Sequence, residues 1–297
     1  MRLNRFDTSN IRVRGGGSGG LIPGGGGGKL GCGSIIIVLI AALVFGVDPA
    51  QMLGTLEQVQ QQAPQQQQGQ AQISSDDEEA LCTQNSYATE ACNALQSLNA
   101  TWEPLFRKAG ISFDQPTLTF YSGGVQSGCG AAQSSMGPFY CPADEGIYID
   151  TSFYDQLARQ LGAKGDFARY YVMAHEYGHH IQKRTGIENQ VRKAQNSNPS
   201  QSNALQVKME LQADCYAGVW AGRNRNLIDP GDMEEGLTAA SAIGDDTLMR
   251  NAGQSVNPEK FTHGTSKQRM AWLKRGIETG NEDACDTFNS SAGLTAP

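Results

Sequence analysis

The run HEYGH at residues 175–179 combines two histidines and a glutamate at a spacing that suits metal chemistry. A separation of four residues places His175 and His179 on the same face of a helix, about one turn apart. Two imidazole nitrogens so placed can share one tetrahedral Zn²⁺. Glu176 follows the first histidine and can take a proton from water on the metal. The run therefore predicts a catalytic zinc site with Glu176 as general base.

An alternative interpretation of this run is a pair of surface histidines on an amphipathic helix. Three of the four histidines in the chain lie within residues 175–180, and the preceding residues 170–174 are apolar and bulky. A buried helix that carried this run without a metal would hold several poorly paired polar groups. The context therefore favours metal binding.

A third metal ligand is predicted at Glu210, because catalytic zinc takes three protein ligands and keeps one position open. Glu210 and Asp214 are four residues apart on a predicted helix. In thermolysin-like enzymes a Glu-x-x-x-Asp helix supplies the third ligand and a supporting carboxylate. Asp214 would then accept the free ring N–H of a ligand histidine. The alternative is two solvated acids, but the segment is strongly apolar and acids there need partners.

The remaining histidine, His263, is a candidate donor to the oxyanion that forms during peptide hydrolysis. Because it precedes the last predicted helix, the alternative is that His263 is a structural loop residue or a helix cap. Arg269 is a weaker candidate for the same donor role. Tyr177 and Tyr216 are further candidates, although tyrosines on apolar helices more often belong to the core.

Two neighbours of the predicted ligands have expected supporting roles. His180 adjoins His179 but points about 100° away around a helix, so it is expected to pack or to support the ligands. Gly178 is expected to let another backbone approach the helix closely. The alternative for Gly178 is mere tolerance of glycine, at a cost of about 1 kcal/mol.

The elements that must position these residues are mostly helices. Residues 117–121 and 146–150 have the composition of strands. Few strands followed by several helices predict an α+β domain. The predicted helices begin with one that starts near residue 89 and continue over residues 151–161, 166–184, 202–222, 231–244 and 265–279.

The strings YYVMAHEYGHHIQ and MELQADCYAGVWAG resemble those of the bacterial family called putative neutral zinc metallopeptidases. The similarity extends through SGGVQSGCGAAQSSMGPFYCPADEGIYID and FTHGTSKQRMAWLKRG and covers most of residues 82–285. The resemblance implies a zincin-like fold with one catalytic Zn²⁺, an N-terminal membrane helix and peptidase chemistry. It also implies that the metal ligands and the general base named above keep their roles.

By analogy with zincins, an edge strand beside the metal-binding helix should bind extended peptide by strand addition. Residues 146–150 are the candidate strand, since they precede that helix most closely. Residues 138–142 are expected to form the rim of the site.

The apolar segment over residues 30–47 carries no charge and would span roughly 27 Å as a helix. Basic residues precede it, and none follows before Arg107. This asymmetry predicts a single-pass helix in the bacterial inner membrane, with the N-terminus in the cytoplasm and the catalytic domain outside. A cleaved signal peptide is the alternative, but the glycine-rich leader is long for that role.

Composition divides the rest of the chain. Residues 1–29 are rich in glycine and are predicted to be a disordered cytoplasmic segment. Residues 48–80 form a glutamine-rich linker. The zinc metallopeptidase domain is predicted over residues 81–289, and residues 290–297 form a flexible tail.

Six cysteines downstream of the apolar segment suggest disulfides if that region is exported. Cys129 and Cys141 flank a short loop and are the best candidate pair. The pairs Cys82–Cys92 and Cys215–Cys285 would complete the set, although six cysteines allow fifteen pairings. Six reduced thiols would be ordinary in a cytosolic protein.

The net charge of −7 makes nucleic acid an unsuitable partner. The predicted function is therefore a membrane-anchored zinc metallopeptidase that hydrolyses peptide bonds in exported or envelope proteins. A non-catalytic zinc-stabilised scaffold or chaperone is the alternative, yet structural zinc sites usually use four protein ligands, whereas three are counted here. Hydrolysis of another amide, such as a cell-wall peptide link, would use the same chemistry.

Overall fold

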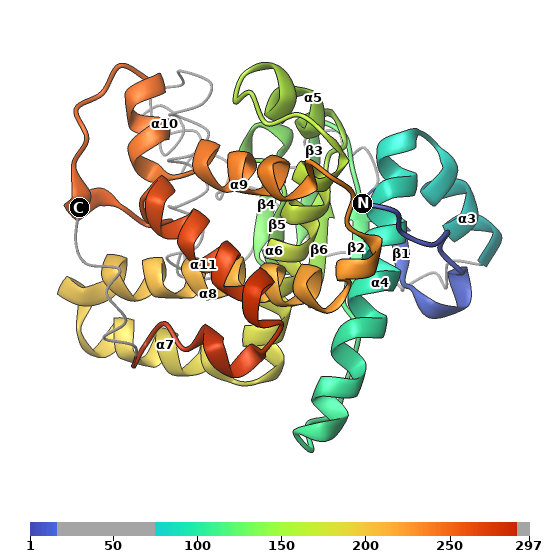
Figure 1. The fold of residues 1–297 in the computed structure, drawn as a ribbon, viewed down its shortest axis with the longest axis horizontal. Coiled ribbons are helices and arrows are strands. Elements are labelled where there is room, and N and C mark those ends of the chain that lie inside the picture. Colours follow the sequence, from blue (N-terminus) through green and yellow to red (C-terminus); the bar gives the residue numbers. More distant parts are fainter. Residues whose placement is uncertain (17–74, 290–297) are drawn as a thin grey trace, which may run out of the picture.

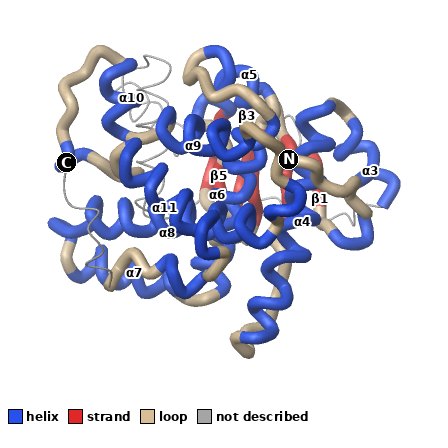
Figure 2. The backbone as a smooth tube through the Cα atoms, viewed as in Figure 1, coloured by secondary structure: helices blue, strands red, loops and turns tan. Residues whose placement is uncertain are grey.

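The computed structural model describes residues 1–16 and 75–289 (Figure 1). Helices predominate in these ranges and surround a small sheet, as Figure 2 shows. Helix α6 (Asp166–Arg184) is central and packs against α4 (Ser86–Lys108), α8 (Ser202–Arg223) and α9 (Asp232–Ala242). The predicted α+β class, mostly helical with a small sheet, is confirmed.

The other elements complete the fold. The remaining helices are α3 (Ser75–Thr83), α5 (Ser152–Arg159), α7 (Ile187–Ser197), α10 (Asp245–Asn251) and α11 (Ser266–Thr279). The strands are β1 (Val13–Gly15), β2 (Thr117–Phe120), β3 (Gly124–Ser127), β4 (Gly130–Gln133), β5 (Phe139–Cys141) and β6 (Gly146–Ile149).

Helix α6 has the bounds that the sequence predicted, and its ends have clear causes. Asp166 lies in its first turn, and Lys183 and Arg184 lie in its last, so the charges complement the helix dipole. Gly186 follows with a φ of 77°, a conformation that favours glycine and ends the helix. The bounds of α8 and α11 also agree with the prediction to within one residue.

Besides α3, whose first residues fall in the predicted linker, two helices were not predicted. Helix α7 is polar, and only Val191 and Gln195 of its residues are buried, so few apolar residues mark it as a packed helix. The predicted helix over residues 231–244 is α9, and α10 follows it almost without a break. Both additional helices contribute residues to the site described below.

The sheet has the order β1-β2-β6-β5, in which β1, β2 and β6 are parallel and β5 is antiparallel to β6. The strand predicted at residues 146–150 is β6, and it lies between two other strands. The prediction that it forms the edge is therefore wrong, and β5 occupies the edge instead. Residues 138–142, expected at the rim, contain that strand. Strands β3 and β4 pair as a separate hairpin.

The prediction of disorder over residues 1–29 is wrong for residues 1–16. Strand β1 pairs with β2, with Val13 opposite Leu118. Phe6, Ile11 and Val13 are buried in the same core as α4 and α6. A few apolar side chains are enough to order this segment because a sheet edge is available to it, which its glycine-rich composition does not reveal. Residues 17–29 lie outside the described residues.

Most of the predicted anchor and linker also lies outside the described residues. This applies to the apolar segment at 30–47, to residues 48–74 and to the tail at 290–297. The end of the predicted linker, residues 75–80, belongs to α3. No helix in the described ranges is long and apolar enough to cross a membrane.

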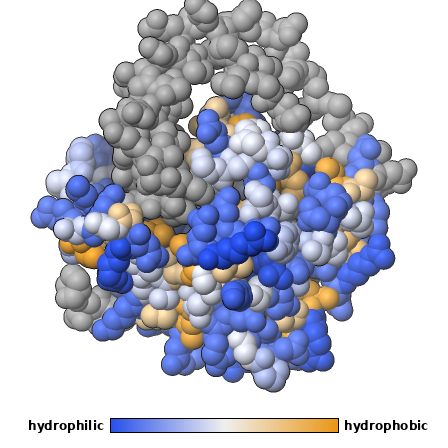
Figure 3. Space-filling model, turned by 90° about the horizontal axis from the view of Figure 1, so that it is seen from above, coloured by the Kyte–Doolittle hydropathy of each residue, from blue (hydrophilic) through white to orange (hydrophobic). Residues whose placement is uncertain are grey.

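Three disulfides link the elements, with the pairing that the sequence suggested. They are Cys82–Cys92, Cys129–Cys141 and Cys215–Cys285. The second fastens the β3–β4 hairpin to the edge strand β5, and the third fastens α8 to the segment after α11. In Figure 3 hydrophilic residues cover most of the described surface in view, and hydrophobic ones are scattered.

Helices α8 and α11 cross at glycines that no larger residue can replace without movement. A Cβ at Gly218 would lie 2.1 Å from the carbonyl oxygen of Leu273, and one at Gly276 would lie 2.0 Å from that of Cys215. The two backbones are therefore in direct contact. This crossing sets the distance between the site residues on α8 and those on α11.

We expect Gly276→Ala to lower the free energy of unfolding by about 3 kcal/mol or more, because the added methyl group must push α8 and α11 apart. Gly124→Ala is the control, since the nearest atom to its new Cβ is 3.7 Å away. Urea denaturation of both variants measures the difference. Equal stability of the two would contradict a tight crossing.

Candidate metal centre

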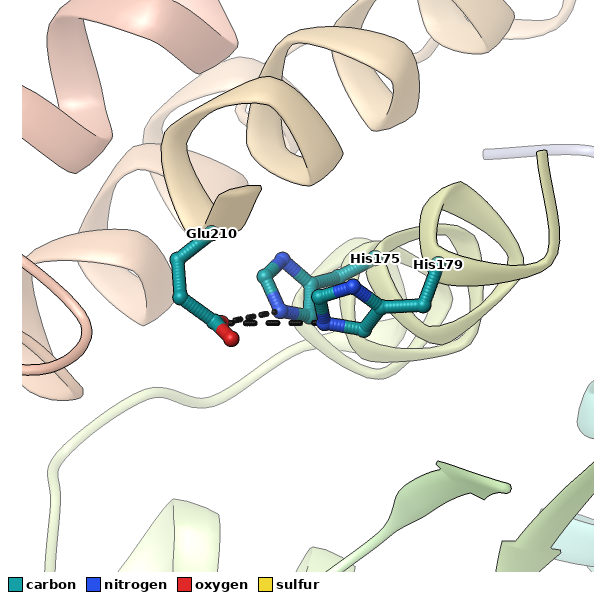
Figure 4. Close-up of side chains that lie close together, drawn as sticks. All are labelled: His175, His179 and Glu210. Carbon is teal, nitrogen blue, oxygen red and sulfur yellow. Dashed lines mark hydrogen bonds and ion pairs between the residues drawn. The ribbon is translucent and has the colours of Figure 1, made fainter. Parts of the chain in front are cut away.

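His175, His179 and Glu210 converge on one point, as Figure 4 shows. Oε2 of Glu210 lies 3.1 Å from Nε2 of His175 and 3.7 Å from Nε2 of His179. Ligands about 2.0–2.1 Å from a tetrahedral Zn²⁺ are roughly 3.3 Å apart. The three atoms therefore fit one metal ion with small adjustments, and the donor set of two imidazoles and a carboxylate suits zinc.

The convergence depends on a close approach of α6 to α8. A Cβ at Gly178 would lie 2.8 Å from Cα of Ala213, so only glycine allows the two backbones to come this near. The expectation that Gly178 permits a close backbone approach is confirmed. The histidines on α6 and Glu210 on α8 face each other across this contact.

Asp214 holds the first histidine, as its spacing predicted. Its Oδ1 lies 2.8 Å from Nδ1 of His175 and accepts a hydrogen bond of 2.6 Å from the hydroxyl of Tyr171. Arg269 donates to both oxygens of Asp214, each at 2.9 Å. With the Nδ1 proton of His175 directed at a carboxylate, Nε2 is free to face the metal position.

His179 has a comparable partner that sequence reasoning missed. Its Nδ1 lies 2.9 Å from Oε1 of Gln182, whose amide donates to the carbonyl of Met209 at 2.7 Å. That donation fixes which end of the Gln182 amide faces the histidine. The signal was present in the sequence, because Gln182 follows His179 by three residues on the same helix.

Burial alone would lower the pKa of His175, but Asp214 and Glu210 raise it to about 9. Burial would also raise the pKa of both carboxyls. For Glu210 the nearby His179 and His175 outweigh this effect and hold its pKa well below the usual range. For Asp214 the pKa is lowered by Arg269 and His175. The centre is therefore a buried set of strongly coupled charges that favours a cation at the histidine nitrogens.

Glu176 is buried next to His175 and lines the same cleft as the three converging residues. Burial raises its pKa, and the neighbouring His175 and His179 oppose that rise in part. A carboxylate whose pKa is raised is better suited to accept and return a proton. The structure thus places Glu176 where the sequence predicted, beside the candidate metal position.

His263 also lines this cleft, on the segment before α11. Its Nδ1 lies 3.1 Å from Oδ1 of Asp245. The other oxygen of Asp245 accepts the backbone N–H groups of Thr262, His263 and Gly264 at 2.6–3.0 Å. Asp245 therefore fixes both the loop and the ring, and Nε2 of His263 remains available to the cleft.

Burial would lower the pKa of His263, but Asp245 outweighs it and raises the pKa. The same pairing lowers the pKa of Asp245. Sequence reasoning missed Asp245, which lies at the start of the unpredicted helix α10. No sequence pattern around Asp245 indicated that its side chain would contact His263, which lies 18 residues later.

The other candidate donors have different roles. Arg269 is only 1% exposed, and its guanidinium is bound to Asp214, so it supports the ligand histidine. The hydroxyl of Tyr177 donates to Asn99, and the ring of Tyr216 packs edge-on against Trp102. Neither tyrosine lines the cleft.

His180 supports the cleft wall and does not face the metal position. Its Nε2 lies 2.7 Å from the carbonyl oxygen of Asp114, and its Nδ1 lies 3.1 Å from the hydroxyl of Tyr140 on β5. Burial lowers its pKa to about 4, so the ring is neutral and can accept from Tyr140 while donating to Asp114. The expectation of a packing or supporting role is confirmed.

The cleft has a volume of about 200 Å³ and is lined mainly by apolar side chains around the polar centre. One wall comes from residues 135–140, which include part of β5. Val172, one turn before His175, lies in the same cleft as Ile243 and Leu248. Such a cleft can enclose part of an extended chain beside the candidate metal position.

A second group of carboxylates lies apart from this cleft. Asp166, Asp232 and Glu235 have oxygens close together. The amino group of Met1 lies 3.0 Å from Asp166 and 2.8 Å from Asp232. The positively charged amino group of Met1 therefore balances the negative charge of this group, so the cluster does not need a metal ion.

Comparison with known proteins identifies one family and several relatives of this chain. A family model described as putative neutral zinc metallopeptidase matches residues 2–288. The chain is 44% identical over 294 residues to the uncharacterized protein YpfJ of Escherichia coli K12, covering 97% of this chain and 98% of YpfJ. It is 39% identical over 208 residues to the uncharacterized protein Rv2575 of Mycobacterium tuberculosis, covering 66% and 68% of the two chains. No solved structure shows a significant match.

Proposed function

The chain belongs to the putative neutral zinc metallopeptidase family, and from this premise we propose that it hydrolyses peptide bonds with a Zn²⁺ ion held by His175, His179 and Glu210. The observation that carries the proposal is the convergence of these three side chains in the cleft that also contains Glu176. Three protein ligands leave one position open, which is typical of catalytic zinc.

When bound by these residues, Zn²⁺ would supply Lewis acidity to the scissile carbonyl and would lower the pKa of water. Glu176 accepts the proton of the attacking water and returns it to the leaving amine. Its burial beside two histidines supports this role, because both its position and its raised pKa suit proton transfer. Asp214 and Gln182 keep the two ligand rings in the required tautomer.

His263 donates a hydrogen bond from Nε2 to the oxyanion, and Asp245 positions it. The bond from Nδ1 to Asp245 leaves Nε2 facing the cleft, and the raised pKa keeps the ring protonated over a wider pH range. A charged donor in a cleft of low dielectric stabilises developing negative charge strongly.

The substrates we propose are extended segments of exported or envelope proteins, bound along the edge strand β5. Strand β5 has a free edge in the described sheet and lines the cleft. Three disulfides support an oxidising compartment outside the cytoplasm.

Replacing Glu176 by glutamine tests the mechanism. We expect Glu176→Gln to bind one zinc ion as tightly as the wild type and to lose about 10³-fold or more in kcat, because the amide cannot accept the proton. Metal content and cleavage of a mixed peptide library measure the two effects. Glu103→Gln is the control, since Glu103 pairs with Arg107 at the surface and does not line the cleft. Wild-type turnover by Glu176→Gln would refute the mechanism.

The pH profile of Asp245→Asn tests the role of His263. Activity that needs protonated His263 is present below its pKa and is lost as pH rises through it. Because Asp245 raises that pKa, removal of its charge should move the alkaline limb of kcat/KM to lower pH. His263→Ala should lower kcat and remove this limb. An unchanged limb in Asp245→Asn would show that another group controls it.

A further inference from the structure

The metal-facing carboxylate of Glu210 has a second oxygen with its own partner. Its Oε1 accepts a hydrogen bond of 2.9 Å from Nε2 of Gln206, while Oε2 faces the histidines. Gln206 lies one helical turn before Glu210 on α8 and is 6% exposed. The two oxygens of the ligand are therefore distinguished by their surroundings.

Arg192 on α7 fixes the direction of the Gln206 amide. Its Nη1 donates to Oε1 of Gln206 at 3.0 Å and to Oε1 of Gln195 at 2.9 Å. A guanidinium has no acceptor, so the oxygen of the amide must face Arg192. The NH₂ end of Gln206 is then directed at Glu210. Glu188 balances the charge of Arg192, with its Oε1 3.3 Å from Nε.

We propose that Gln206, oriented by Arg192, is a positioning residue that keeps Glu210 bound to the metal through one oxygen. A carboxylate with a free Oε1 can rotate and bind through both oxygens, which fills the position that substrate and water need. The hydrogen bond from Gln206 opposes that rotation. The inference rests on the proposed function, since it assumes that zinc binds at Glu210.

These hydrogen bonds also connect helix α7, which was not predicted, to the candidate metal centre. Arg192 and Glu188 lie on α7, and both line the cleft together with Gln206. The side chain of Arg192 is 32% exposed, so the outer end of the network meets solvent while its inner end meets the ligand. Groups that hold a ligand in this way typically alter metal affinity by 10- to 100-fold.

The test measures zinc affinity of the full-length protein by chelator competition, independently of activity. Gln206→Met keeps the volume and removes the donor, so we expect the zinc dissociation constant to rise 10- to 100-fold. Gln206→Leu is a second, uncharged variant that also lacks the donor and should weaken zinc similarly. Gln195→Ala is the control: it removes the other acceptor of Arg192 without touching Glu210.

Cobalt substitution reports the coordination number directly. The wild type and Gln195→Ala should show the visible spectrum of a four-coordinate ion, and both Gln206 variants should shift towards five-coordination. Unchanged affinity and spectrum in a folded Gln206 variant would overturn the proposal. If these shifts occur but the zinc-loaded wild type cleaves no peptide, the proposed function fails and the positioning role stands.

A separate observation concerns the side of the membrane on which the N-terminal residues lie. Strand β1 pairs with β2, and the backbone N–H of Leu118 donates to the carbonyl of Arg12 at 2.9 Å. The amide of Asn99 donates to the carbonyl of Asn10 at 3.0 Å, and Phe6 is buried. Residues 1–16 and 75–289 therefore form one folded body.

We infer that residues 1–16 and the catalytic domain lie on the same side of the membrane. A chain that crosses a bilayer once has its flanks on opposite sides, so one crossing between residues 16 and 75 would separate β1 from β2. The topology predicted from basic residues, with the N-terminus inside and the domain outside, is not compatible with this pairing.

Cysteine labelling of the full chain in cells tests this inference. Asn4→Cys and Val256→Cys, each with Cys32→Ser, place single thiols at exposed positions in the two parts. A maleimide that cannot cross the inner membrane should label both to the same extent before lysis. Labelling of Val256→Cys alone before lysis would overturn the inference. Labelling of both only after lysis would support it and refute the proposed extracytoplasmic location.

Discussion

The buried carboxylate of Asp214 is the interaction on which the centre depends. It is fully buried and joins three helices, through His175 and Tyr171 on α6 and Arg269 on α11. A buried carboxylate is costly unless it is paired and hydrogen-bonded, and here a guanidinium binds both of its oxygens. Removing either partner would leave a charge in the interior. The ring of His175 is held in place by the same constraint that keeps the helices together.

The electrostatics of the site follow from this packing. Arg269 binds the buried carboxylate of Asp214, whereas Glu210 lies against His175 and His179, so a surplus of negative charge falls on the histidine nitrogens. This surplus of negative charge raises the pKa of His175 to about 9. A divalent cation at the point where the three ligand atoms meet would satisfy it better than a proton does, which favours metal binding over an empty site.

The walls of the cleft are built from parts of the chain that are distant in sequence. The edge strand β5 is fastened on one side by the Cys129–Cys141 disulfide and on the other by the bond between Tyr140 and His180. His263 is set by Asp245 at the start of α10. Each wall therefore has a rigid contact with α6 or its neighbours, so a bound chain would meet a preformed site.

Most of the long helices and the ligands within them follow from the sequence alone, because a spacing of four puts His175 with His179, and Glu210 with Asp214, on one helix face. It could not place Asp245 or Arg192, whose roles depend on which backbones meet. The ordering of residues 1–16 and the position of β5 at the sheet edge could not be predicted from the sequence either. Strand order and the ordering of a short apolar segment depend on which sheet edge is free, and only the tertiary structure decides that.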